Sequence, residues 1–100
     1  MRSSALLRSA NLTAAILRFA DLANVDLRGG YLGRADMEGA ILVDADLRCA
    51  NLDRAVMRRT DLTRADLTGA WLGRADLCGA NLQGAKLSGV DLTNVAGWGP

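Results

Sequence analysis

The stretch from Asp61 to Leu82, DLTRADLTGAWLGRADLCGANL, carries a Leu at every fifth position. A step of five residues turns an α-helix by about 140°, so these leucines would spiral round a helix and form no apolar stripe. On a continuous strand, an odd step would place successive leucines on opposite faces. The stretch therefore excludes both a long helix and a flat sheet. The same period runs through the chain, with Leu or Met at positions 7, 12, 17, 22, 27, 32, 37, 42, 47, 52, 57, 62, 67, 72, 77, 82, 87 and 92.

Each five-residue unit is explained by a short extended segment followed by a turn. Ala65 and Leu67 are two residues apart and therefore share one face of an extended segment. The second residue after Leu is often Gly or Asn, and a type II turn needs a positive φ at that place. If each turn is near a right angle, four segments close a coil of about 20 residues, and residues 20 apart stack at about 4.8 Å. The sequence thus predicts an all-β solenoid, a quadrilateral parallel β-helix of about four and a half coils and about 22 Å in height.

The repeated unit resembles the motif of the pentapeptide-repeat family, in which Ala, then Asp or Asn, and then Leu are followed by two variable residues. Ala-Asp-Leu occurs at 20–22, 45–47, 65–67 and 75–77, with Met for Leu at 35–37, and Ala-Asn-Leu occurs at 10–12, 50–52 and 80–82. The resemblance implies a right-handed β-helix with the Leu and the small residue inside. It covers residues 5–95, and leaves residues 1–4 as an N-terminal lead-in and residues 96–100 as a C-terminal tail or plug. The small position is not Ala at Val25, Gly30, Thr60, Val90 and Val95, and the three valines are expected to push the wall slightly outward.

The composition argues against an enzyme. The chain has 12 basic and 11 acidic residues, a net charge of +1 and no His, so it lacks the commonest general base and metal ligand. Cys49 and Cys78 fall on sides half a coil apart, which predicts neither a disulfide nor a thiol or metal site. We therefore expect no catalytic residues, cofactor or metal.

Exposed thiols, together with the lack of a secretory or membrane-spanning apolar run, predict a cytoplasmic protein that does not bind a membrane. The Arg, Ser and Ala before Asp21 also fit a mitochondrial transit peptide. However, Leu7, Leu12 and Leu17 already follow the period, which favours structural residues there.

Two columns of arginine are predicted on the outside, 20 residues apart within each column. Arg8, Arg28 and Arg48 have Asp26 and Asp46 close by, so we expect a neutralised ladder that serves solubility. The second column consists of Arg34, Arg54 and Arg74 at one corner, and the side before this corner carries the aromatic residues Tyr31 and Trp71. Exposed aromatic and arginine side chains together favour a protein-binding patch. The predicted partner-binding residues are Tyr31, Arg34, Arg54, Trp71 and Arg74.

An alternative role for the two aromatic rings is structural: each would lie over a neighbouring glycine, Gly33 or Gly73, and protect the wall. Three further arginines, Arg58, Arg59 and Arg64, are expected to widen the second column into a basic belt.

The ends of a solenoid expose the apolar interior and unpaired backbone groups. We expect Trp98 to fold back over Leu87 and Leu92 as a plug, with Gly97 and Gly99 permitting the bend and Pro100 ending the strand. At the other end only Met1 and Leu6 are near to cover the first leucines, which predicts a two-fold homodimer through the N-terminal coil. The residues assigned to this end-to-end association are Leu6, Leu7, Leu12, Leu17 and Trp98.

The sequence as a whole favours a non-enzymatic scaffold that binds an unknown protein partner through a flat wall. The family resemblance implies an alternative, a gyrase-binding DNA mimic that protects topoisomerase from quinolones, but the balanced charge disfavours it. A further alternative is binding of nucleic acid or another anionic surface through the basic belt. The near-zero net charge disfavours nucleic acid as a partner.

Overall fold

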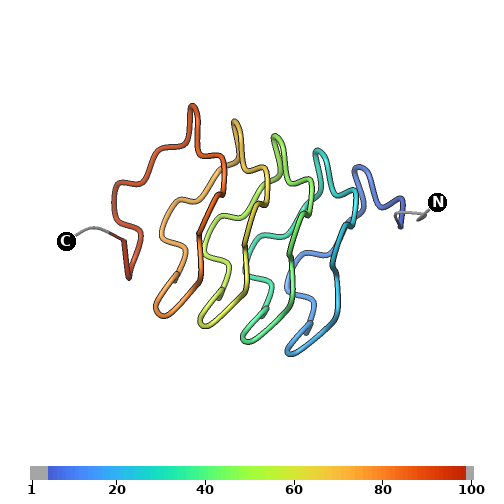
Figure 1. Ribbon diagram of the computed structural model, residues 1–100, viewed down its shortest axis with the longest axis horizontal. Coiled ribbons are helices and arrows are strands. Elements are labelled where there is room, and N and C mark those ends of the chain that lie inside the picture. The colour runs from blue at the N-terminus through green and yellow to red at the C-terminus, as the bar shows by residue number, and fades with distance from the viewer. Residues whose placement is uncertain (1–4, 99–100) are drawn as a thin grey trace.

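The computed structural model describes residues 5–98, which wind into a four-sided solenoid whose coils stack along one axis (Figure 1). Within these residues there is no α-helix and no continuous strand. The regular structure consists of single-residue parallel bridges separated by two-residue turns. Consequently no helix in this part of the chain is long and apolar enough to cross a membrane. The predicted lead-in at residues 1–4, together with Gly99 and Pro100, lies outside the described residues.

Every bridge joins residues 20 apart, from the pair Leu6 and Asp26 to the pair Asp76 and Ala96. The backbone hydrogen bonds show the register. The N–H of Leu52 donates to the carbonyl of Trp71 (2.7 Å), and the N–H of Asn51 donates to the carbonyl of Gly30 in the coil on the other side (2.9 Å). The predicted 20-residue coil is therefore confirmed.

The corners are turns closed by a hydrogen bond from the small residue to the Leu three positions before it, as from the N–H of Ala55 to the carbonyl of Leu52 (3.0 Å). The second central residue has a positive φ at every corner, whether it is Gly or not: φ is +70° at Gly69 and +60° at Arg54. The turn prediction is confirmed. The positive φ also occurs at corner residues that have a side chain, for which this left-handed backbone conformation is costly.

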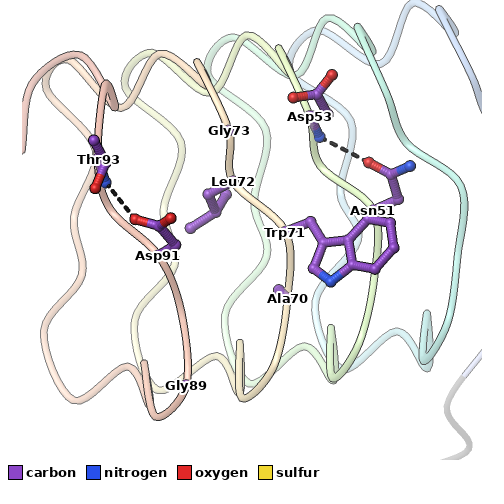
Figure 2. A pocket seen from close by; sticks show the side chains of 9 residues that line it. All are labelled: Asn51, Asp53, Ala70, Trp71, Leu72, Gly73, Gly89, Asp91 and Thr93. Carbon is purple, nitrogen blue, oxygen red and sulfur yellow. Dashed lines mark hydrogen bonds between the residues drawn. The ribbon is translucent and has the colours of Figure 1, made fainter.

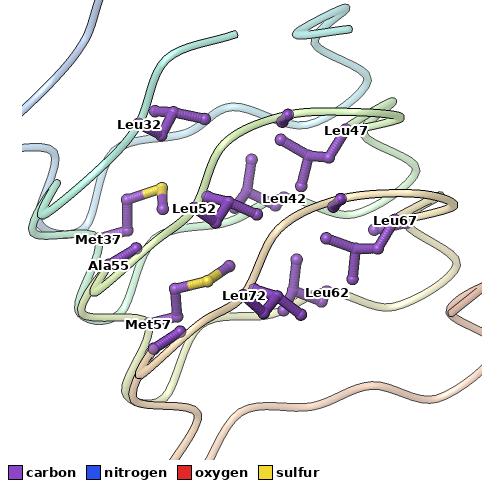
Figure 3. Close-up of a cluster of buried hydrophobic side chains, with 14 of the residues drawn as sticks. Leu32, Met37, Leu42, Leu47, Leu52, Ala55, Met57, Leu62, Leu67 and Leu72 are labelled. Carbon is purple, nitrogen blue, oxygen red and sulfur yellow. The ribbon is translucent and has the colours of Figure 1, made fainter. Parts of the chain in front are cut away.

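The interior is a column of Leu and Met side chains, four to a coil, packed against small residues (Figure 3). Leu47, Leu52, Met57 and Leu62 are 0% exposed, as predicted for one coil. Thr60 occupies a small position in the same coil, and its buried hydroxyl donates to the carbonyl of Met37 (2.8 Å). Full burial is lost toward both ends of the solenoid, where the leucines are half-buried: Leu7, Leu12, Leu17, Leu22, Leu82, Leu87 and Leu92.

At the C-terminal end the ladder continues to Ala96, and Gly97 turns the chain tightly against Cys78. A Cβ at Gly97, where φ is +80°, would lie 2.6 Å from the backbone nitrogen of Cys78. Trp98 is 45% exposed, so its side chain is half covered. At the N-terminal end Leu6 is largely exposed. The plug and the N-terminal dimer remain predictions.

Candidate functional site

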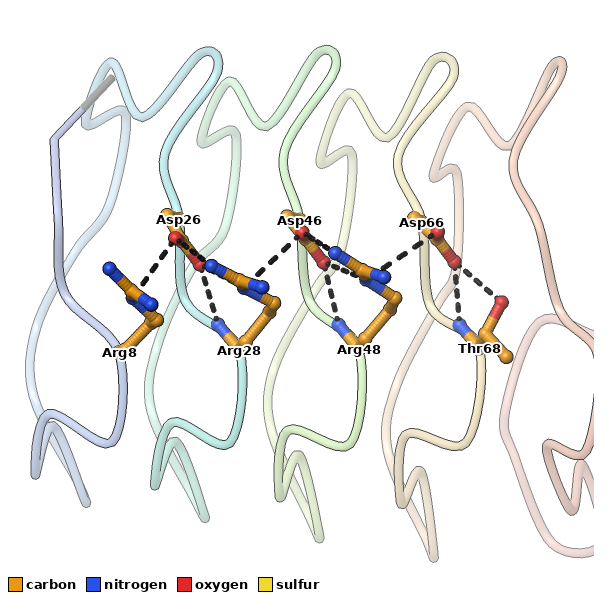
Figure 4. Close-up of polar contacts among 7 residues, drawn as sticks. All are labelled: Arg8, Asp26, Arg28, Asp46, Arg48, Asp66 and Thr68. Carbon is orange, nitrogen blue, oxygen red and sulfur yellow. Dashed lines mark hydrogen bonds and ion pairs between the residues drawn. The ribbon is translucent and has the colours of Figure 1, made fainter. Parts of the chain in front are cut away.

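The first arginine column forms a continuous chain of ion pairs along one corner (Figure 4). Arg28 binds Asp26 within its own coil (Nη2 to Oδ2, 2.8 Å) and approaches Asp46 in the next coil (Nε to Oδ2, 3.6 Å). Arg48 repeats the pattern one coil further on. The hydrogen bond from Arg28 lowers the pKa of Asp26 to about 2. The predicted neutralised ladder is confirmed, and it leaves little free charge for a ligand.

The basic belt predicted around Arg58, Arg59 and Arg64 was wrong. Each of these arginines pairs with a carboxylate that lies close to it only because of the coil register. The pairs are Arg58 with Asp76 (3.7 Å), Arg59 with Glu38 (3.8 Å) and Arg64 with Asp44 (2.8 Å).

Arg34, Arg54 and Arg74 behave differently from every other arginine in residues 5–98, because they alone have no ion-pair partner among those residues. All three side chains are exposed, and all three residues occupy the positive-φ position of one corner. Like charges stacked one coil apart repel one another, so this stripe is not explained by stability.

The two predicted aromatic residues lie on the adjoining side, where both bridge Asn51. Tyr31 is 53% exposed and Trp71 is 67% exposed. The Trp71 indole points toward the coil that carries Asn51 (Figure 2). We call the surface formed by these six residues the Trp71 wall: Tyr31, Arg34, Asn51, Arg54, Trp71 and Arg74.

The rings do not cover the neighbouring glycines, so the structural interpretation of the aromatics was wrong. A Cβ at Gly73 would meet the Asp53 carboxylate at 2.8 Å, and one at Gly33 would meet the Asp53 carbonyl oxygen at 3.6 Å. No ring atom lies within 4 Å of either position. An aromatic does cover a glycine elsewhere, since the Phe19 ring lies 2.5 Å from a Cβ at Gly39. Trp71 and Tyr31 are thus available to a partner.

An open hollow of about 550 Å³ lies beside Trp71 (Figure 2). The polar side chains at its rim accept hydrogen bonds from backbone N–H groups two residues further along the chain. The N–H of Asp53 donates to Asn51 Oδ1 (3.0 Å), and the N–H of Thr93 donates to Asp91 Oδ1 (2.9 Å). The bonds from Thr93 lower the pKa of Asp91, so this carboxylate is ionised at neutral pH. The complete lining consists of Asn51, Asp53, Ala70, Trp71, Leu72, Gly73, Gly89, Asp91 and Thr93.

The hollow exists because one bridge of the ladder is missing. Bridges join Asp66 to Lys86 and Asp76 to Ala96, but none joins Trp71 to Asp91 between them. As a result, the N–H groups of Leu72 and Arg74 and the carbonyl of Ala70 have no backbone partner within residues 5–98. Such backbone groups are normally paired, yet Ala70 and Leu72 are only 2% and 1% exposed, so their unpaired groups are also largely covered.

Valines flank the side that lacks the bridge. The detached side runs between Val90 and Val95, whereas the side below it runs between Ala70 and Ala75. The turn hydrogen bonds donated by the two valines are 3.2 and 3.3 Å long, compared with 2.9 and 3.0 Å for the two alanines. The turn bonds of Val25 and Thr60 are as long, at 3.2 and 3.3 Å, beside intact bridges, so the bond lengths alone do not account for the missing bridge. The two consecutive valines mark its position.

The arrangement offers binding groups but little for catalysis. No cluster of His, Cys, Asp or Glu that could hold a metal ion occurs in the described part of the chain. Cys49 and Cys78 are free and exposed, as predicted. Hydrogen bonding to Asp76 raises the pKa of the Cys78 thiol, which lowers its reactivity at neutral pH.

Comparison with known proteins decides the family. The family model of pentapeptide repeats matches in eight copies over residues 3–29, 20–59 and 60–95. The chain belongs to the pentapeptide-repeat family. No curated protein sequence matches it.

Several solved structures of pentapeptide-repeat proteins are similar. Rfr23 from the cyanobacterium Cyanothece 51142 is 33% identical with a TM-score of 0.88, over 91% of this chain and 63% of that chain. The protein alr5209 from Nostoc PCC 7120 is 45% identical with a TM-score of 0.75, over 78% and 64% of the two chains. HetL from Nostoc sp. strain PCC 7120, involved in heterocyst differentiation regulation, is 32% identical with a TM-score of 0.79, over 99% and 50%. This chain therefore spans between half and two thirds of the length of these relatives.

Sequence reasoning found the Trp71 wall but missed the hollow beside it. Asp53, Gly89, Asp91 and Thr93 look like ordinary repeat residues, and only the bridge pattern brings them to one cavity. The signal that could have found it was the pair Val90 and Val95 at consecutive corners.

Proposed function

We propose that this pentapeptide-repeat protein is a non-enzymatic scaffold that binds a protein partner through the Trp71 wall. The observation that carries the proposal is the unpaired arginine stripe, Arg34, Arg54 and Arg74, beside two exposed aromatic rings. Arg, Trp and Tyr are the side chains that most often dominate protein interfaces. The other arginines in residues 5–98 are neutralised within the chain, so the Trp71 wall is where binding groups remain free.

The proposal also includes the expectations that the structure does not test. We place the protein in the cytoplasm, as a right-handed solenoid of about four and a half coils that associates as a homodimer through its N-terminal coil. The regulatory involvement of the similar protein HetL is compatible with a binding role, since regulation often acts through binding surfaces.

The alternatives receive less support. A DNA mimic needs rows of free carboxylates, whereas Asp26, Asp46 and Asp66 are engaged with arginines. Nucleic acid would meet the arginine stripe but also the Asp53 and Asp91 carboxylates beside it. A DNA supercoiling assay with and without a quinolone tests the first alternative, and retention on heparin at rising salt tests the second.

A photo-crosslinking experiment tests the proposal directly. The crosslinking amino acid benzoylphenylalanine replaces Tyr31 on the Trp71 wall or, as a matched control, Ile41, which is also an exposed bridging residue but lies two sides further round. In an extract of the source cells we expect a defined protein to be crosslinked at position 31 and not at position 41. Arg54→Gln with Arg74→Gln should abolish that product. Equal crosslinking from both positions, or none from position 31, would contradict the proposal.

A further inference from the structure

The arginine stripe is a straight row of evenly spaced positive charges. Arg34, Arg54 and Arg74 occupy the same corner of three consecutive coils. The ladder fixes their spacing, since the N–H of Arg34 donates to the carbonyl of Asp53 (2.9 Å) and the N–H of Arg54 donates to the carbonyl of Gly73 (2.7 Å). Coils stack at about 4.8 Å, so the stripe has steps of about 4.8 Å and a length of about 9.6 Å. A partner with anions at the same spacing would relieve the repulsion between these charges.

The exposed aromatic residues form an apolar strip beside the arginine stripe. Tyr31 and Trp71 lie on the same side of the solenoid, two coils apart, and both are exposed. Their backbones are therefore also about 9.6 Å apart. The Trp71 indole extends toward the coil of Asn51 and so covers part of this distance (Figure 2). A partner that contacts both features must present acidic and apolar side chains in two parallel rows.

We propose that the Trp71 wall binds an amphipathic α-helix of a partner protein. The helix lies along the solenoid axis, with acidic residues against the arginine stripe and apolar residues against Tyr31 and Trp71. Residues three and seven apart share one face of a helix and are separated along its axis by about 4.5 Å and about 10.5 Å. Acidic residues at i, i+3 and i+7 thus match the three arginines. The inference rests on the proposed protein-binding role and names the chemistry of the partner.

Two other occupants fit this wall less well. Side chains on one face of an extended segment repeat every 6.7 Å or so, which does not match successive arginines about 4.8 Å apart. A nucleic acid would meet the Asp53 carboxylate, which lies over Gly73, because a Cβ at Gly73 would be only 2.8 Å from it. This charge would repel phosphates. A helix avoids the repulsion by placing an uncharged side chain opposite Asp53.

A pair of peptides with the same composition provides the probe and its control. The probe is acetyl-Ser-Leu-Ala-Gln-Glu-Ala-Gln-Glu-Leu-Ala-Gln-Glu-Leu-Ala-Ala-Leu-Ala-amide, in which Glu at i, i+3 and i+7 lie beside a stripe of Leu when the peptide is helical. In the control peptide each Glu is exchanged with the Gln that precedes it. The exchange keeps the net charge, the spacing of the Glu residues and the Leu stripe, but turns the acidic face by about 100°, to the side opposite the Leu stripe. Circular dichroism checks that both peptides have equal helicity.

NMR on the complete, nitrogen-15-labelled protein measures binding at individual side chains. Addition of the probe should shift the Nε–H signals of the arginine stripe and the indole N–H signal of Trp71. The Nε–H signals of Arg28 and Arg48 should stay in place, because both side chains are engaged in the ladder of ion pairs. From the titration we expect the control peptide to bind at least about tenfold more weakly than the probe.

Three protein variants test which charges the helix recognises. Arg54→Gln with Arg74→Gln should weaken binding of the probe by at least about fivefold. The matched control, Arg28→Gln with Arg48→Gln, removes the same net charge from another corner and should change binding by less than about twofold at physiological ionic strength. Asp53→Asn removes the carboxylate beside the stripe and should strengthen binding of the probe by about threefold.

The inference is overturned if the two peptides bind equally well, since the wall would then recognise charge alone, as for an extended acidic segment or a polyanion. It is also overturned if the probe leaves the signals of the arginine stripe in place, or if the two double variants weaken binding equally. If these results appear while position 31 still crosslinks a protein, the proposed function stands with a partner of different chemistry. If the probe binds as expected but position 31 crosslinks nothing, the preference for an acidic amphipathic helix stands and the proposed function fails.

Discussion

Replacing Leu52 by Ala tests how firmly the interior is supported by the ladder. Leu52 is fully buried, between Leu32 and Leu72 in the adjacent coils. Its backbone is held on both sides, by the bond from its own N–H to Trp71 (2.7 Å) and by the bond from Leu32 N–H to Asn51 (2.8 Å). Because the walls are kept at the strand spacing, the solenoid cannot collapse into the space that the side chain leaves. We therefore expect a loss near the upper end of the usual range for this substitution, about 4 kcal/mol.

The matched control is Leu12→Ala, which removes the same atoms from the half-buried N-terminal coil and should cost about 1 to 2 kcal/mol. Guanidinium unfolding followed by circular dichroism gives both values, with the slope of the transition showing whether unfolding remains cooperative. Equal losses for Leu52→Ala and Leu12→Ala would refute the argument, because a wall that relaxes freely would not distinguish a closed coil from an open one.

Further predictions concern the corners, the interior and the charge ladder. Arg54 has a φ of +60°, so Arg54→Gly should be more stable than Arg54→Ala by about 1 kcal/mol in the same unfolding assay, and equal stability would show that the corner is unstrained. Ala65→Leu overfills the interior and should cost at least about 2 kcal/mol, whereas Thr63→Leu, at a partly exposed position, should cost less than about 1 kcal/mol; equal tolerance would contradict the inside and outside assignment. The folded pKa of Asp26 is lowered to about 2, so its stabilising contribution is present above its unfolded pKa of about 3.9 and is lost as the pH falls toward 2. Asp26→Asn should flatten the dependence of melting temperature on pH in that window, and an unchanged dependence would assign the acid sensitivity to other carboxylates.

The fold was predictable because a five-residue period is satisfied by very few structures, and the same arithmetic placed Leu52 and Thr60 correctly inside. The pairing of individual charges was harder to foresee. Arg59 is not close in sequence to Glu38. The coil register brings the two residues into adjacent coils, but the side-chain rotamers decide whether they meet. The hollow was missed for a related reason, since the sequence showed the valines but not that the bridge between them is absent. The wall of Tyr31 and Trp71 was predictable because residues a multiple of 20 apart lie on the same side of the solenoid.

The register of 20 residues per coil has a consequence for changes in chain length. Deletion of one pentapeptide, for example residues 41–45, would leave every remaining unit able to form a side. It would, however, rotate the N-terminal part of the solenoid by a quarter turn relative to the rest. Arg34 would then stack on Arg59 instead of Arg54, and the arginine stripe would be split between two corners. Deletion of four pentapeptides would restore every column and only shorten the rod. The 20-residue register thus decides which residues share a surface of this molecule. An insertion or deletion can therefore erase a binding site without removing any of its residues.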